Sequence, residues 1–264
     1  MNTRLAPRVQ LPSAPGLAAP AVEIPQYTLG RILSVWLIAA VPMGVLAWVV
    51  APRHASTLGG PEPLARALII SLTIGLVWQF VVVAILVRRE QGTLRWSVVR
   101  EALWLRAPRS PRSGRTGGRV WLILIPLVVA FGAEELISLP APAARDMGLF
   151  LDSPAGQGFL DGNWSFFGVV VLLGLFNTVL GEELLFRGFL LPRMNGSFGR
   201  ADWVANGVLF AVYHLHMPWV IPSALLDTFI LSYPTKRYRS AWIGIAVHSA
   251  QTLVITAAVL AVVL

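Results

Sequence analysis

Long apolar runs separated by short polar segments constrain this chain more than any other feature. A run of about 20 apolar residues is the length that an α-helix needs to cross the hydrocarbon core of a bilayer. Backbone groups cannot stay unpaired in lipid, so such runs predict helices. Seven spans are predicted, at residues 32–51, 68–87, 120–139, 166–191, 203–217, 219–233 and 241–264. We therefore expect an all-α, polytopic transmembrane helix bundle of about seven spans, within a range of six to eight.

The composition fits this prediction. Of the 264 residues, 56% are hydrophobic and 13% are charged, whereas about a quarter of the residues in a soluble domain are charged. Cysteine is absent, which excludes thiol catalysis, disulfides and cysteine-ligated metal. The net charge of +8 comes almost wholly from arginines in the loops between apolar runs. The positive-inside bias of membrane proteins explains these arginines, so we expect no nucleic-acid partner.

The distribution of arginine predicts the orientation of the chain. Residues 88–119 hold nine arginines against two glutamates, and this loop is therefore predicted to be cytoplasmic. Counting spans from the loop places the N-terminus in the cytoplasm, together with the basic residues of 193–200 and 236–239. The compact, arginine-rich and lysine-poor chain favours a bacterial source, so we expect an integral protein of a bacterial plasma membrane.

The sequence divides into three parts. Residues 1–30 are rich in proline and alanine, and we predict a disordered tail. Residues 31–165 hold the first transmembrane helices and the basic cytoplasmic loop. Residues 166–264 form the predicted functional core. Its runs at 203–217 and 219–233 are short for full spans, so we expect tilted helices or a broken hairpin there.

Three ionisable residues lie together in the fourth apolar run, in the segment GEELLFRGFLLP. Charged groups at this depth cost roughly 2.5 kcal/mol or more each, so they indicate a functional site by default. On a helix, Glu183 and Arg187 are four residues apart and face each other, which predicts an ion pair. Glu182 points about 100° away and is left free for chemistry. The alternative is that neighbouring helices satisfy all three side chains.

Three of the four histidines also lie in apolar runs. With a rise of ~1.5 Å per residue, Glu182, His214 and His248 lie roughly 11–16 Å from the predicted cytoplasmic face. This shared depth is the main argument from the residues for a site between three helices. His216 is two residues from His214, so we expect it to face nearly the opposite way, in a structural role.

Glu182, His214 and His248 are together suited to the activation of water. A carboxylate beside a neutral imidazole can take a proton from water and pass it to a leaving amine. The second histidine can donate to the oxygen that becomes negative in a tetrahedral intermediate. Alternatively, the three side chains could hold zinc with water as the fourth ligand, whereas the first version needs no cofactor. The sequence does not separate the two versions, and no HExxH motif occurs.

Other acids in the apolar runs have simpler interpretations. Glu134 and Glu135 lie near the end of the third run without an arginine or histidine following at helical spacing, and we assign them to the membrane interface. Asp227 lies in the sixth run and is interpreted as a helix-packing hydrogen bond.

Three motifs in the second half of the chain resemble those of a known family. EELLFR at 182–187 is similar to EExxxR, FAVYH at 210–214 is similar to FxxxH, and His248 stands where an HxxxN motif begins. In this order they resemble the motifs of the CPBP intramembrane endopeptidases. That family includes the type II CAAX prenyl proteases and bacterial relatives linked to bacteriocin processing and immunity. The resemblance covers residues 166 to about 253.

The resemblance implies that Glu182 is the base that acts with His214 on the water, and that His248 stabilises the oxyanion. The implied activity is that of an intramembrane endopeptidase acting on a peptide or protein substrate at the bilayer. The alternative is a non-catalytic membrane immunity or scaffold protein on the same fold. A third interpretation is a small transporter with a proton-coupled carboxylate, which would spread polar residues through the membrane depth.

The same resemblance assigns supporting positions. Glu183 and Arg187 would support the pocket, and Phe210 would pack beneath the histidine one turn after it. Thr252 stands where the third motif has asparagine, and it keeps a hydroxyl donor.

Overall fold

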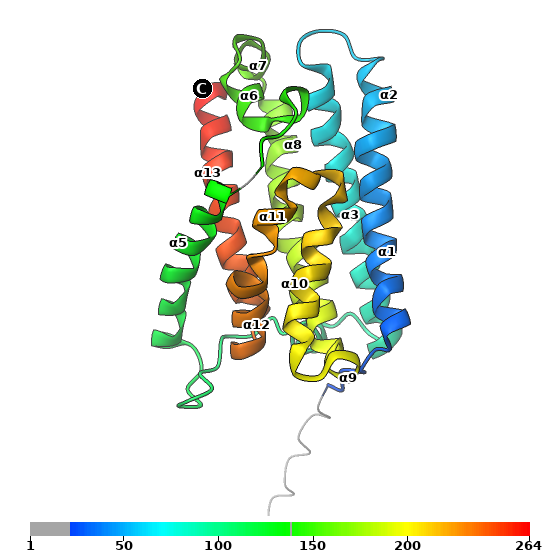
Figure 1. Ribbon diagram of the computed structural model, residues 1–264, viewed down its shortest axis with the longest axis vertical. Helices are drawn as coiled ribbons and strands as arrows, with labels where there is room; N and C mark the ends of the chain where they lie inside the picture. Colours follow the sequence, from blue (N-terminus) through cyan, green and yellow to red (C-terminus); the bar gives the residue numbers. More distant parts are fainter. Residues whose placement is uncertain (1–21, 138) are drawn as a thin grey trace, which may run out of the picture.

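The computed structural model describes residues 22–137 and 139–264 (Figure 1). This part of the chain is an all-α bundle, in which one isolated bridge of the β type joins Arg109 and Thr116 outside any strand. Among the described residues, four helices are long and apolar enough to cross a membrane: Leu29–Ala55, Pro63–Gln91, Trp164–Arg193 and Ala241–Val263. The protein is therefore an integral membrane protein.

The first two long helices pack side by side along one edge of the bundle (Figure 1). The first consists of α1 (Leu29–Val45), the π-helical η1 (Leu46–Val50) and α2 (Ala51–Ala55), and the second is α3 (Pro63–Gln91). Gly75 of α3 leaves room for the side chain of Met43. Shorter elements follow: α4 (Trp96–Ala102), η2 (Gly118–Ile123), α5 (Leu124–Glu134), η3 (Glu135–Ile137), η4 (Ala143–Arg145), α6 (Met147–Asp152) and α7 (Pro154–Leu160).

The third long helix is only partly α-helical. It runs through α8 (Trp164–Leu175), η5 (Phe176–Gly181), η6 (Leu184–Leu190) and η7 (Leu191–Arg193). Both η5 and η6 are π-helical, and they flank Glu182 and Glu183. π-helical turns are rare and frequently lie at functional sites. The backbone conformation therefore indicates a functional site in the same segment as the charge pattern does.

The last part of the chain enters the bundle, turns back and ends in a long helix. Its elements are α9 (Asn195–Phe198), η8 (Gly199–Ala201), α10 (Asp202–Tyr213), η9 (His214–His216), η10 (Pro218–Val220), α11 (Ile221–Ala224), η11 (Thr228–Ser232), α12 (Tyr233–Tyr238) and α13 (Ala241–Val263). Gly207 of α10 lies directly against Thr228 of η11, so the entering and returning arms form the broken hairpin that the short runs suggest.

Three of the predicted spans are built from elements too short to cross a bilayer alone. The run at 120–139 is divided by η2, an eleven-residue α5 and η3. The run at 203–217 leaves the α-helix at Tyr213, and the run at 219–233 is divided among η10, α11 and η11. Pro218 disfavours helical backbone in the residue before it, which agrees with φ −142° and ψ 68° at Met217. The count of seven spans stays a prediction.

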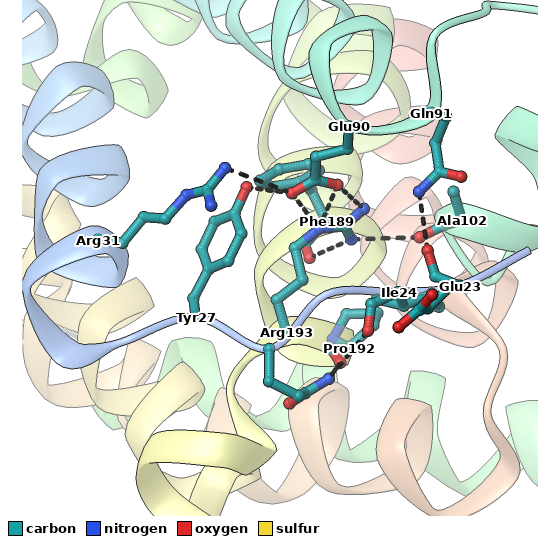
Figure 2. Close-up of polar contacts among 11 residues, drawn as sticks. Glu23, Ile24, Tyr27, Arg31, Glu90, Gln91, Ala102, Phe189, Pro192 and Arg193 are labelled. Atoms are coloured by element: carbon teal, nitrogen blue, oxygen red, sulfur yellow. Dashed lines mark hydrogen bonds and ion pairs between the residues drawn. The ribbon is translucent and has the colours of Figure 1, made fainter.

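The segment before α1 differs from the predicted tail. Residues 1–21 lie outside the described residues, whereas residues 22–28 are bound to the bundle. Tyr27 is 2% exposed, and its backbone N–H donates to the carbonyl of Arg193 at 2.9 Å. Its hydroxyl donates to the carboxylate of Glu90 (Figure 2). The expectation of disorder is wrong for this stretch, because a composition average overlooks one aromatic anchor.

Candidate active site

Glu183 is the centre of a buried polar cluster between the third long helix and α13. Its Oε1 atom accepts hydrogen bonds from Arg187 Nη1 at 3.0 Å and from His248 Nδ1 at 3.1 Å. The side chains of all three residues are buried. The predicted ion pair between Glu183 and Arg187 is confirmed. The contact with His248 joins this pair to a second membrane-spanning helix.

Gly244 allows α13 to approach this cluster closely. A Cβ atom at position 244 would collide with Glu183 Oε2 and lie 3.3 Å from Arg187 Cγ. Gly244 is four residues before His248, so both residues present the same face of α13. The absence of a side chain at 244 therefore allows the imidazole of His248 to reach the carboxylate.

His214 directly follows α10, where the α-helix ends. Its Nδ1 atom lies 2.9 Å from the carbonyl oxygen of Phe210. A carbonyl only accepts, so Nδ1 carries the proton and Nε2 of the neutral ring is an acceptor. The ring of Phe210 lies 4.8 Å from the His214 ring and 6.3 Å from the His248 ring, between centroids. The guanidinium of Arg187 covers the Phe210 ring at 3.8 Å.

Glu182 is buried and takes no part in the ion pair of Glu183. It interacts with the hydroxyl of Tyr213 through a side-chain hydrogen bond and with His248 electrostatically. Gln79 Nε2 of α3 donates to the same hydroxyl at 2.6 Å. Because that oxygen already accepts from Gln79, its own proton is available for the carboxylate of Glu182.

Glu182 also lines a cavity of about 230 Å³ between α1, α3, α6, the third long helix and α13. The lining is mostly apolar; its other polar side chains are Asn177 and His216. Of the acids that the structure describes, only Glu182 contributes to the wall of this cavity. The arrangement places one carboxylate at the edge of an apolar space that is large enough for a water molecule or a substrate side chain.

The segment that holds these residues matches a family of proteases. Residues 163–254 match the Rce1-like family, described as type II CAAX prenyl endopeptidase Rce1-like. This segment belongs to that family. The match includes EELLFR, FAVYH and His248, so the resemblance of the motifs is confirmed. Comparison with curated proteins and with solved structures gives no significant match.

His216 of the Rce1-like segment does not face away from His214. The two rings stack with centroids 5.4 Å apart and planes 24° apart, and His216 lines the cavity together with Glu182. The expectation of opposite faces is wrong because α-helical geometry stops at Tyr213 and a 3₁₀ turn follows. This places His216, too, beside the candidate site.

Two acids with other assignments belong to the polar cluster. Asp227, just before η11, is buried and interacts electrostatically with Arg187 and His248. It also forms a side-chain hydrogen bond with Glu134 of α5. Glu134 is buried, so its assignment to the membrane interface is wrong, while the side chain of Glu135 lies outside the described residues. The third apolar run therefore contributes a carboxyl group to the cluster around His248.

Thr252 lies one turn after His248 and packs its methyl group against Gly174 of α8. A Cβ atom at position 174 would collide with Thr252 Cγ2 at 2.5 Å. A compact β-branched side chain fits this helix–helix contact. Packing is thus a physical reason for threonine at a position where the family motif has asparagine.

The zinc alternative can be tested against the donor geometry. The described residues hold no group of three His, Asp or Glu side chains placed to share a metal ion. His248 directs Nδ1 to Glu183, and His214 directs Nδ1 to a backbone carbonyl. A zinc site needs its donors at about 2 Å from one point. Both histidines keep Nε2 free, and metal-bound histidines often hold their other nitrogen in this way, so the zinc version stays a prediction for metal analysis.

The three predicted site residues are brought into one buried region. Electrostatic interactions link His248 with Glu182 and with His214. Sequence reasoning misses Tyr213 and Gln79. A polar residue in the middle of the second apolar run is the signal that could have indicated Gln79.

Proposed function

We propose that this protein is an intramembrane endopeptidase in which Glu182 activates the water that cleaves a peptide bond. The match of residues 163–254 to a family of proteases supports the reaction class. One observation supports Glu182 above the other acids. Glu182 lines the cavity, whereas Glu183 is engaged by Arg187 and His248.

The proposed reaction begins with water between Glu182 and His214. The carboxylate of Glu182 takes a proton from water, and the water oxygen attacks the carbonyl carbon of the scissile peptide bond. Nε2 of His214, held as an acceptor by the Phe210 carbonyl, orients the other hydrogen of the water. The carbonyl oxygen becomes an oxyanion. When the intermediate collapses, the C–N bond breaks and Glu182 returns its proton to the leaving amine.

His248 is the proposed donor to the oxyanion. For this role its ring must carry both protons: Nδ1–H donates to Glu183, and Nε2–H is directed to the developing charge. Glu183 and Arg187 are positioning residues in this proposal, because they hold the imidazole without touching the substrate. The residues 166–264 then form the catalytic core, supported from α3 by Gln79 and from α5 by Glu134.

A cleavage assay tests the proposal. Purified full-length protein in liposomes is incubated with a membrane-protein extract, and mass spectrometry counts new peptide N-termini. Glu182→Gln and His214→Ala should each lower the rate by at least about 100-fold. The matched control is Glu101→Gln, which removes a partly exposed acid outside the site and should leave the rate unchanged. Equal product from wild type and both site variants would support the non-catalytic immunity or scaffold protein instead.

Metal removal separates the two versions of water activation. Since the described residues hold no group of three side chains placed to share a metal ion, we expect that treatment with a zinc chelator leaves the cleavage rate within twofold of the untreated rate. Loss of the rate on chelation, with recovery on adding zinc, would establish the metal version.

We also propose that the protein lies in a bacterial plasma membrane with its N-terminus in the cytoplasm. The basic loop between α4 and η2 supports this orientation. Since the chain has no cysteine, a single Arg112→Cys or Gln157→Cys substitution gives one labelling site. Membrane-impermeant maleimide added outside intact cells should label Cys at 157 and spare Cys at 112. The reverse pattern would invert the orientation.

A further inference from the structure

A basic cleft of about 750 Å³ lies at the end of the bundle that holds α9, α12 and the loop after α4 (Figure 1). Six cationic residues contribute to its wall: Arg106, Arg109, Arg200, Lys236, Arg237 and Arg239. None of the acids in the described part of the chain contributes to it. The basic cleft shares no residue with the cavity beside Glu182.

Most of the positive charge in the basic cleft is uncompensated by the protein. Arg106 pairs with Glu101 at 3.2 Å, and Lys236 pairs with the buried Asp202. Within the described ranges, the other four cations form no ion pair with an acid. Like charges gathered in one hollow repel one another, so the cleft favours an anion from outside the chain.

The backbone fixes the walls of the basic cleft. Arg109 N–H donates to the carbonyl of Tyr238 at 3.0 Å, and Ala241 N–H donates to the carbonyl of Trp104 at 2.9 Å. Ser240 Oγ donates to the carbonyl of Arg106 at 2.5 Å. These bonds join residues that are at least 129 positions apart in sequence. The cationic side chains therefore extend from a fixed frame and not from two unrelated loops.

Aromatic and small polar side chains complete the basic cleft. Trp203 and Tyr233 lie in its wall with their rings 5.0 Å apart in an edge-to-face arrangement. These two residue types prefer the headgroup level of a bilayer, where one part of the ring meets lipid and the other meets water. Ser110, Thr116 and Asn195 add neutral hydrogen-bonding groups.

We propose that the basic cleft binds the phosphate-bearing headgroup of an anionic phospholipid. Guanidinium groups match phosphate oxygens in geometry as well as charge. Free phosphate offers the same oxygens, but it has no apolar part that would contact the rings of Trp203 and Tyr233. Basic pockets where helices meet the headgroup region are suited to anionic lipids. The occupant would lie where α12 passes into α13, at the base of the helix that presents His248.

Thermal unfolding of the purified full-length protein in neutral detergent tests this site. The added probes are phosphatidylglycerol, phosphatidylcholine with the same acyl chains, and inorganic phosphate. Phosphatidylglycerol should raise the Tm of the wild type by several degrees, and the other two probes should raise it by less than one degree. The Arg109→Gln/Arg200→Gln/Arg237→Gln variant should lose most of the shift. Arg88→Gln/Arg89→Gln/Arg95→Gln removes three exposed charges outside the cleft and should keep it.

Several results would overturn the proposal. One is an equal shift by phosphatidylglycerol in wild type and both triple variants, which would indicate attraction to the surface as a whole. Another is an equal shift by inorganic phosphate, which would assign the cleft to a free anion. If the cleft variant does not fold, native mass spectrometry of Arg200→Gln counts bound phosphatidylglycerol, and retention at the wild-type level would exclude the site.

Discussion

Two arginines on the third long helix, Arg187 and Arg193, have side chains that are 0% exposed, and they differ in how fully they are paired. Every nitrogen of the Arg193 guanidinium donates to an acceptor (Figure 2). Nε and Nη2 donate to Glu90 at 3.0 and 2.6 Å, while Nη1 donates to the carbonyls of Phe189 and Ala102. This cluster also anchors the chain before α1.

Arg187 makes only part of the bonds that its side chain permits. Its Nη1 donates to Glu183, whereas its Nε and Nη2 have no hydrogen-bond partner within the described residues. Glu183 Oε2 has no hydrogen-bond partner among these residues either. An unmet buried group costs about 1–3 kcal/mol, and proteins accept such costs mainly at functional sites. We therefore expect the Arg193 cluster to serve stability and the Arg187 cluster to serve the proposed site.

Loss of Arg193 should have the largest effect on stability. Arg193→Met leaves Glu90 buried without its main counter-charge, which should cost about 3–5 kcal/mol of unfolding free energy. Unfolding in mixed micelles measures this cost, and the cleavage rate per folded molecule should be unchanged. The matched control is Arg31→Gln, because Arg31 is 51% exposed and 3.8 Å from the same carboxylate. Its loss should cost under about 1 kcal/mol.

Loss of Arg187 should cost less stability and more activity. Arg187→Met removes one hydrogen bond and two unmet donors, and Glu183 keeps His248 as a partner. We expect a loss of about 1–3 kcal/mol and a fall in cleavage rate of about tenfold or more per folded molecule. A stability loss equal to that of Arg193→Met, with a normal rate, would break the comparison.

The hydroxyl of Tyr27 supplies a smaller and pH-dependent effect. Tyr27→Phe removes one hydrogen bond to Glu90 and should cost about 1 kcal/mol. Burial, and then the contact with Glu90, raise the pKa of Tyr27. The unfolded chain therefore ionises first, and stability is lost as the pH rises above about 10. The fall of the unfolding free energy with rising pH should be less steep in Tyr27→Phe. It should be unchanged in Tyr233→Phe, whose side chain is exposed.

Asp227 should give the smallest change in stability. Asp227→Asn keeps the shape and a hydrogen-bonding group toward Glu134, so the unfolding free energy should change by less than about 1 kcal/mol. Because Asp227 interacts with Arg187 and His248, the cleavage rate should fall by about three- to tenfold. An unchanged rate, measured across pH 5–9, would show that Asp227 only joins helices.

The sequence predicts the helical class, the membrane location and the Glu183–Arg187 pair because each follows from local spacing or composition. Bilayer-length apolar runs need no knowledge of neighbours, and an i, i+4 pair needs only one helix. Pro218 and two short runs predict either tilted helices or a broken hairpin, and the structure has the hairpin. These features require no tertiary information.

Contacts between distant segments are what the sequence leaves out. His248 reaches Glu183 because α13 has a glycine at 244, and that fit depends on how two helices pack. Glu134 joins Asp227 because the third run ends inside the protein. The turn at η9 rotates His216 toward the cavity, a change that α-helical spacing cannot anticipate.

The π-helical turns on either side of Glu182 and Glu183 have a consequence for the register of the whole helix. Each such turn holds one residue more than an α-helical turn over the same length of backbone. Deleting one residue from η6 would restore the ordinary winding and leave the side chains after the turn facing the same neighbours, because the wide turn absorbs the extra residue. Deleting one residue from the α-helical part, α8, would instead rotate every later side chain by about 100°, so the wide turn lets this helix hold an extra residue without changing which acids and bases beyond it can meet.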